Sequence, residues 1–257
     1  MKYIFILLIF VFELFGGVVK APIVSVDMDK ESAVIKIDKI DVGMSGFVLH
    51  YISKGHSCIL KNAVVESFDK EKKLAKVKLS RYNALRQNSL PMGEWQVEVG
   101  DDVILAFGYN RGVLIAPDEE IYHKVTKATR QLQWIHPDIF ATILSFYGHP
   151  TPQRDDFTSL SNAGSVGLLF FYLNQKLYTV DAKSFVILNI TDAPLVQKET
   201  KLPFYTRVQE IDAAWWGKGS DEMTSYEPHY FELLKEANPD NKQLQAEIDK
   251  FNKRIAK

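Results

Sequence analysis

Cysteine is almost absent from this chain, since Cys58 is the only one among its 257 residues. A single thiol excludes an internal disulfide framework, and with no cysteine at the end of the N-terminal apolar run a lipid-modified anchor is excluded as well. Charge of one sign is also lacking, because 31 Lys and Arg against 32 Asp and Glu leave a net charge of −1. Without a basic stripe, nothing supports nucleic-acid binding.

Long apolar runs are missing except at the N-terminus, where Lys2 precedes an unbroken apolar stretch from Tyr3 to Phe12. The stretch is too short for a membrane span and has the layout of a secretory signal, so we expect residues 1–21 to direct export to the cell surface or periplasm. Cleavage after Ala21 would leave Pro22 first, which signal peptidase processes poorly. Cleavage nearby and retention as an uncleaved membrane anchor both stay open.

Internal repeats and low-complexity tracts are absent too, and 46% hydrophobic residues predict a folded chain. Residues 22–117 read as a β-rich unit, because Ala33–Ile37 and Leu74–Leu79 alternate apolar and polar residues. Further strands are expected at 46–52, 58–68, 103–107 and 113–116. Short strands separated by glycine-containing turns predict a small barrel or sandwich.

Residues 118–193 read as an α/β unit. Asp118, Glu119 and Glu120 place acidic charge where it favours a helix start. Three helices are expected at 118–130, 137–148 and 151–164, and three strands at 166–173, 176–180 and 184–190. Together with the β-rich unit, this predicts a mixed α+β fold.

Residues 194–257 read as an irregular segment followed by two helices, a helical C-terminal appendage, at about 227–237 and 239–255. The last helix carries one apolar stripe made of Leu244, Ile248, Phe251 and Ile255. We expect the stripe to dock on its own domain, with a partner helix as the alternative. The pair Trp215-Trp216 is expected to anchor its loop on a core, the alternatives being a membrane interface or a ligand groove.

Catalytic patterns are weak, and we predict that the chain is not an enzyme and needs no cofactor. Ser165 lies in a near match to the G-x-S-x-G elbow, but a helix ends and a strand begins there, so it is expected to be a turn residue. His136, Asp138 and His149 could form an acid–base group. Neighbouring prolines explain the same residues as helix ends.

His50, His56 and Cys58 are close in sequence and are candidate metal ligands. A zinc site would need a fourth donor and usually tighter spacing, so a buried thiol beside two ordinary histidines is expected instead. The pairs Asp101-Asp102 and Asp155-Asp156 are adjacent in sequence only, and neighbouring side chains on a strand or helix do not face each other.

The chain ends on cations. Lys253, Arg254 and Lys257 follow the apolar stripe, at a helix end where the dipole favours positive charge. A terminal lysine carries an ammonium and a free carboxylate on one flexible stem. A groove with an acidic pocket, an aromatic floor and a basic rim recognises such a group, as in the kringle domains of plasminogen.

Whole phrases of the sequence resemble the N-terminal domain of the bacterial plasminogen-binding surface proteins, over about Ile23 to Asp192. They are Tyr109–Pro117, Trp134–Ala141, Gly148-His149-Pro150 and Ser165–Phe171. The resemblance implies a surface protein that captures host plasminogen through Lys257. We expect it to be non-enzymatic, with Lys253 and Arg254 as auxiliary cations. The alternative is a periplasmic or inner-membrane-anchored interaction module of the cell envelope, which uses the apolar stripe for assembly.

Overall fold

The computed structural model describes residues 17–82 and 95–256. Contacts divide them into two compact units, which meet in the sequence between Phe107 and Gly108. The first unit is all β and the second is mixed, so the predicted α+β class is confirmed. Most of the predicted signal segment and Lys257 lie outside the described residues.

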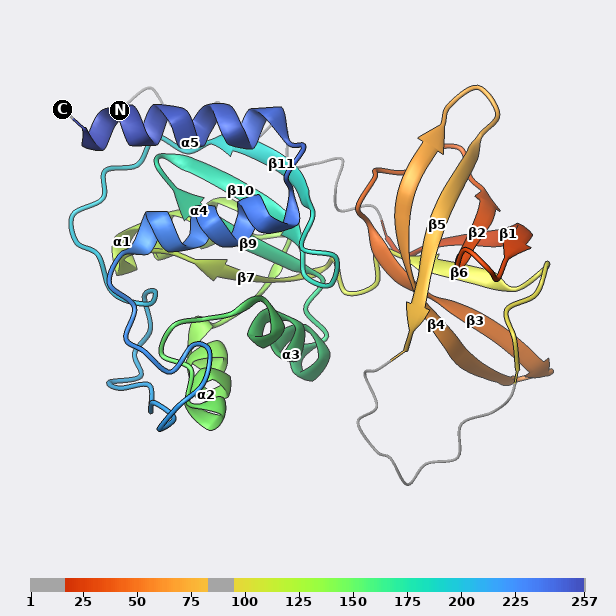
Figure 1. Cartoon of the computed structure of the whole chain (residues 1–257), viewed down its shortest axis with the longest axis horizontal. Helices are drawn as coiled ribbons and strands as arrows, with labels where there is room; N and C mark the ends of the chain where they lie inside the picture. Colours follow the sequence, from red (N-terminus) through yellow and green to blue (C-terminus); the bar gives the residue numbers. More distant parts are fainter. Residues whose placement is uncertain (1–16, 83–94, 257) are drawn as a thin grey trace. The chain divides into compact units, whose positions relative to one another are not determined.

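The first unit is a closed six-stranded barrel with antiparallel neighbours in the order β1-β2-β5-β4-β3-β6, drawn in red to yellow in Figure 1. Its strands are β1 (Val19–Asp27), β2 (Ser32–Lys36), β3 (Ser45–Ser53), β4 (His56–Asp69), β5 (Leu74–Arg81) and β6 (Asp102–Leu105). Alternate residues such as Ile35, Val48 and Val77 are buried, as expected for side chains that fill a small barrel. Gly46 has no room for a side chain, because a Cβ there would collide with the carbonyl of Ile104 on β6.

The barrel begins before the predicted end of the signal. Val19 to Pro22 pair with β6, which closes the barrel, and Ala21 is buried. Lys20 also forms an ion pair with Asp102, at 2.8 Å between Nζ and Oδ2. Cleavage after Ala21 would remove these contacts, so the folded unit overlaps the predicted segment by three residues.

The second unit is built on a five-stranded sheet in the order β11-β10-β9-β7-β8. The strands are β7 (Arg111–Ile115), β8 (Gln133–Ile135), β9 (Leu168–Leu173), β10 (Lys176–Asp181) and β11 (Ile187–Asp192). β7 runs parallel to β8 and β9, and the other neighbours are antiparallel. The predicted boundary after Pro117 is therefore displaced by ten residues, because β7 joins the second sheet and not the barrel.

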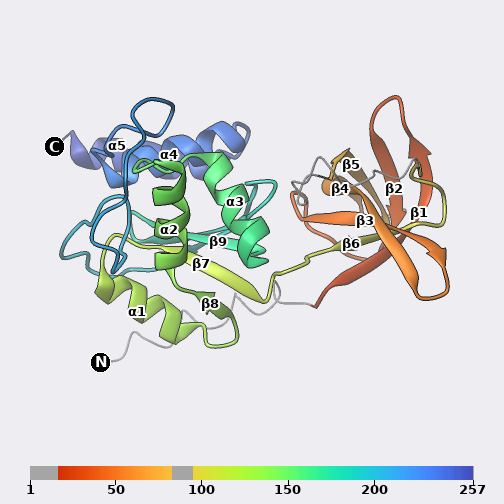
Figure 2. The same ribbon diagram turned by 90° about the horizontal axis from the view of Figure 1, so that it is seen from below.

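Helices cover both faces of this sheet. They are α1 (Glu119–Ala128), α2 (Pro137–Tyr147), α3 (Arg154–Gly164), α4 (Tyr226–Ala237) and α5 (Lys242–Ile255). Figure 2 shows α1 on one side and α2 and α3 on the other. Side chains of α2, α3, α4 and α5 share one core with β7, β9 and β10. The C-terminal helices are thus part of the second unit, where the sequence had suggested an appendage.

Helix ends lie close to where the sequence placed them. The Asp118 carboxylate caps α1 by accepting a hydrogen bond from the amide of Ile121 at 2.7 Å. Gly148 ends α2 in the left-handed conformation, at φ 71°. Ser165 is the left-handed C-cap of α3, which confirms it as a turn residue. No helix in the described ranges is long and apolar enough to cross a membrane.

Candidate functional site

Helix α5 carries two of the three predicted plasminogen-binding residues, and its inner face is fixed to the second unit. The Asn241 side chain caps the helix by accepting from the amide of Leu244 at 3.0 Å. Leu244 and Phe251 are buried, and the Phe251 ring lies 5.3 Å from that of Phe231 on α4. Most of the stripe therefore docks on its own domain, and only Ile255 is left largely exposed. The use of the stripe for assembly is overturned.

Ion pairs also help to fix α5 to the second unit. The buried carboxylate of Glu247 lies 2.8 Å from the ammonium of Lys250 and 3.7 Å from that of Lys176 on β10. The pKa of Lys176 is raised mainly by its hydrogen bond to Asp192 and, to a smaller extent, by the charge of Glu247. The inner side of α5 is therefore electrically compensated, and its outer side holds the remaining cations.

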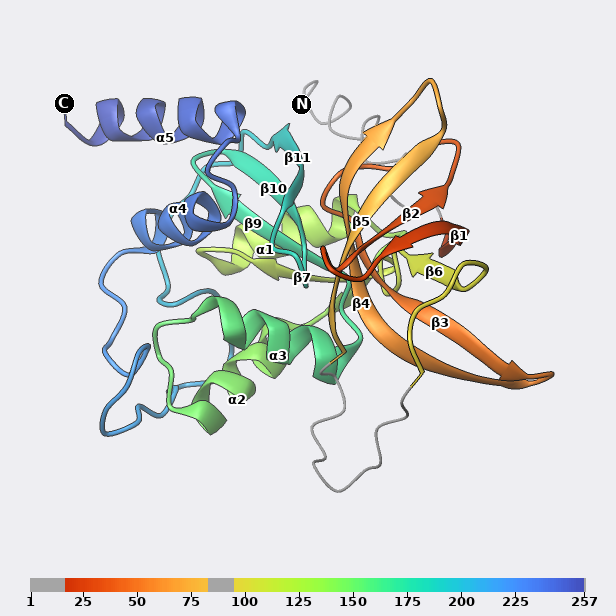
Figure 3. The same cartoon turned by 45° about the vertical axis from the view of Figure 1, so that its right-hand side comes forward.

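Lys253 and Arg254 are exposed in the last turn of α5. Among the described residues Lys253 has no ion-pair partner, whereas the Arg254 guanidinium lies 5.6 Å from the centre of the Phe251 ring. Figures 1 and 3 show this end of α5 at the margin of the second unit. The fold thus presents two predicted residues at one helix end.

A cavity of about 400 Å³ lies beside Arg254. Its walls include Tyr172, Glu199 and Glu227 as well as Arg254 itself, so charges of both signs are present. The Tyr172 hydroxyl donates to the carbonyl of Leu195 at 2.9 Å, while burial raises the pKa of this phenol to about 12. With its charges mixed, the cavity does not select an ion of one sign.

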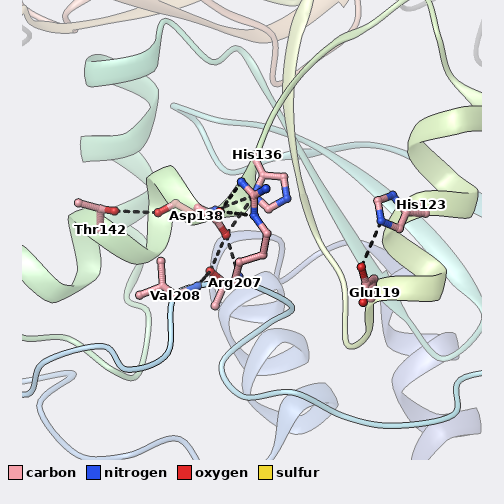
Figure 4. Close-up of polar contacts among 8 residues, drawn as sticks. Glu119, His123, His136, Asp138, Thr142, Arg207 and Val208 are labelled. Atoms are coloured by element: carbon pink, nitrogen blue, oxygen red, sulfur yellow. Dashed lines mark hydrogen bonds and ion pairs between the residues drawn. The ribbon is translucent and has the colours of Figure 1, made fainter.

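Asp138, which could have belonged to an acid–base group, lies at the start of α2, as the helix-end interpretation expects, and acts as a clasp there (Figure 4). It accepts hydrogen bonds from the Thr206 hydroxyl at 2.8 Å and from the Arg207 backbone amide at 2.8 Å and Nε at 2.7 Å. Burial acts to raise the pKa of Asp138, but these hydrogen bonds outweigh it and hold the pKa below 3.8. The carboxylate stays ionised and joins residues 206–207 to α2.

His136 caps the same helix, because its Nδ1 accepts from the amide of Asp138 at 3.2 Å. Burial lowers the pKa of this imidazole, and the charge of Asp138 only partly opposes the effect. Its ring packs against Tyr122 and Tyr205 with centroids 5.1 and 6.1 Å away. His123, labelled beside Glu119 in Figure 4, belongs to the same aromatic group through Tyr122.

His149 does not join this group. It follows the opposite end of α2, a helix of 11 residues that spans about 16 Å at 1.5 Å per residue. Its Nδ1 lies 2.8 Å from the carboxylate of Asp156, which also accepts from the amide of Gln153. His136, Asp138 and His149 therefore do not assemble into one acid–base site.

The barrel histidines have separate partners. His50 lies 2.8 Å from the buried carboxylate of Asp101, and His56 lies 3.2 Å from the hydroxyl of Ser53. Cys58 is partly buried. In the part of the chain that the structure describes, no three potential donors gather in a metal-binding arrangement.

The tryptophan pair contradicts the expectation of core anchoring. Trp215 is 97% exposed and Trp216 is 82% exposed. Their loop lies against the end of α2, where Phe146 is 84% exposed. Gly217 and Gly219, which follow the pair, are the sequence signal for a projecting loop. The prediction of burial rested instead on the general tendency of large aromatic side chains to lie in a core.

Comparison with known proteins matches residues 18–234 to the family described as "Plasminogen-binding protein pgbA N-terminal". The chain belongs to this family. It is 27% identical over 214 residues to plasminogen-binding protein PgbA of Helicobacter pylori strain J99, and equally to that of strain 26695. Each alignment covers 82% of this chain and 46% of the relative, so the chain spans about half the length of the curated relatives it matches. No solved structure matches.

The family match covers some of the candidate residues and leaves others outside. It ends at Leu234, within α4, so α5 with Lys253 and Arg254 lies beyond the matched region. The exposed pair Trp215-Trp216 lies inside it. The sequence identified the family and singled out the tryptophan pair, but it predicted burial for two side chains that are exposed.

Proposed function

We propose that this protein binds plasminogen and that it is exported to the cell surface. The observation that carries the proposal is the family match over residues 18–234, together with relatives named for plasminogen binding. The apolar segment at the N-terminus supports export. The binding role is non-enzymatic.

For the recognition element we propose Lys257, with Lys253 and Arg254 as auxiliary cations and the kringle domains of plasminogen as the receptor. The exposure of the last turn of α5, with Lys253 and Arg254 on it, supports this role, because a partner can reach this end of the helix without unfolding the domain. Exposed cations add to the association rate and to salt dependence more than to affinity. Lys257 should therefore dominate the affinity, and the two auxiliary residues the kinetics.

The test is binding of the full chain, with an untagged C-terminus, to immobilised plasminogen. Deletion of Lys257 should abolish most of the binding, and a free lysine analogue should compete with the intact chain. The matched control is Lys242→Ala, which removes an exposed lysine from the first turn of the same helix. Equal binding by the Lys257 deletion and the intact chain would refute the role of that residue.

Auxiliary cations are tested by Lys253→Ala combined with Arg254→Ala. We expect a lower association rate at low salt, a difference that shrinks as salt rises, and a nearly unchanged dissociation rate. A changed dissociation rate at every salt concentration would mean that these residues contact plasminogen directly in the bound state.

A second function is favoured by the end of the family match at Leu234, ahead of α5. The matched domain would then be a periplasmic or inner-membrane-anchored, non-enzymatic interaction module of the cell envelope, held by an uncleaved N-terminal segment. An intact Met1 on the mature protein, together with resistance to protease added to whole cells, would support this function. Removal of Met1 and digestion on whole cells would exclude it.

A further inference from the structure

Four exposed aromatic side chains lie at the end of α2 and on the loop that is held to it, and we call them the aromatic tip: Phe146, Tyr147, Trp215 and Trp216. The two tryptophans are almost fully exposed, and the phenylalanine is 84% exposed. Leaving such apolar area in water is costly, and exposed aromatic side chains that gather at one place commonly mark an interaction site. Neither the polar clasp at Asp138 nor the cations of α5 uses them.

The loop that carries the two indoles is held to α2 on the side that precedes them. The Ala214 amide donates to the carbonyl of Gly148 at 2.9 Å, and the Asp212 amide donates to the Ser145 hydroxyl at 3.1 Å. Phe146 and Tyr147 lie between Ser145 and Gly148 in the sequence. These contacts therefore bring the helix aromatics and the loop to the same corner of the unit.

The side that follows the indoles is held as well. The Thr151 amide donates to the carbonyl of Gly219 at 3.1 Å, and the Thr151 hydroxyl donates to the carbonyl of Asp221 at 2.6 Å. In Figures 1 and 3 the blue chain that precedes α4 loops out beside α2. Residues 215–218 are thus a short projection fixed at both ends, which reduces the entropy lost on binding.

The shape and chemistry of the tip favour a lipid surface. An indole that is 97% exposed has almost no protein beside it, whereas protein-binding hot spots usually sit in packed, water-excluding surroundings. Indole and phenol rings carry a polar edge on an apolar body, and such rings concentrate at the interface between lipid and water.

The charges around the tip indicate which lipids it suits. Lys218 is an exposed cation within the projection, but Asp212, Asp221 and Glu222 are exposed close to it in the sequence. The local charge is not basic, so attraction to anionic headgroups does not drive the contact. We propose that the aromatic tip inserts into the interfacial layer of a bilayer with electrically neutral headgroups.

The test uses the full chain with phosphatidylcholine vesicles whose acyl chains are brominated, since bromine quenches only those indoles that reach the lipid. The chain has four tryptophans, so the variants must identify the ones that are quenched. Trp215→Ala combined with Trp216→Ala should lose most of the quenching. The control Trp95→Ala, which removes a half-exposed indole of the barrel unit, should keep it.

A second variant keeps both indoles and changes only their surroundings. Phe146→Asp places a charge in the tip. It should raise the lipid concentration needed for half-maximal quenching about tenfold or more. Thermal unfolding of each variant checks that the fold is retained. The N-terminal apolar segment is present in every variant, so it cannot produce the differences among them.

Several outcomes would overturn the proposal. Quenching that is equal with and without Trp215 and Trp216 would place the lipid contact elsewhere on the chain. Quenching that requires anionic lipid and disappears in high salt would assign the contact to charge. Tip-dependent binding to plasminogen or to a second copy of the chain, without quenching by vesicles, would make the tip a protein-binding surface. Quenching restricted to the intact tip in neutral vesicles supports the proposal.

Discussion

Replacing Phe251 with alanine should release the second half of α5. Its ring is buried, packs on Phe231 and supports the guanidinium of Arg254. A buried Phe→Ala change costs about 3–5 kcal/mol. Leu244 and the contacts of Glu247 still hold the first half, so the loss falls on the last two turns, which are too short to stay helical alone.

Hydrogen exchange measures this opening directly. A loss of about 3 kcal/mol corresponds to a factor of about 10² in the exchange of amides that open locally. The matched control is Ile255→Ala, which removes a largely exposed side chain one turn later and should change stability by no more than about 0.5 kcal/mol. If both variants exchange alike across residues 249–256, Phe251 does not hold the second half of α5 to the second unit.

Three further predictions concern other contacts. Gly148→Ala should destabilise the second unit by at least about 1 kcal/mol in chemical denaturation and should disturb the aromatic tip. The reason is that φ is 71° at this position and a Cβ would collide with Ala214. Gly164→Ala, which creates no such collision, is the control. Asp138→Asn should lower the free energy of unfolding at neutral pH. The difference from the unmodified chain should shrink as pH falls below 3.8, because the carboxyl group, whose pKa is lowered in the fold, stabilises it only while ionised. A chain starting at Pro22 should melt lower than one starting at Gly17, because it lacks part of β1; equal melting temperatures would contradict this.

Local signals in the sequence predicted most of the helices and strands of the second unit. Acidic residues after Asp118, the proline at 137 and the glycine at 148 define helix ends by their own backbone chemistry. Asn174-Gln175 connects β9 and β10 with both residues at positive φ, as a tight hairpin turn requires. These features depend on neighbours in the sequence, so they can be read without the fold.

Features that depend on distant partners could not be read in this way. β7 has the same apolar pattern whether it closes a barrel or joins a second sheet, and its parallel partner β9 begins more than fifty residues later. Val19 to Ala21 look like the end of a signal until their pairing with β6 is known. Likewise, the loop that carries the exposed Trp215 is held to α2 by hydrogen bonds between residues 67 positions apart, such as Ser145 and Asp212.

The two proposed contacts differ in how much they depend on the fold, and this difference separates them experimentally. A lysine at a chain end can enter a groove from an unfolded stem, so Phe251→Ala should leave plasminogen binding within a few-fold of the unmodified chain. The aromatic tip needs both ends of its loop held in place, so Gly148→Ala should weaken vesicle contact and spare plasminogen binding. If Phe251→Ala instead abolished plasminogen binding, the receptor would be reading a folded helix surface that includes Lys253 and Arg254, and not the terminal lysine alone.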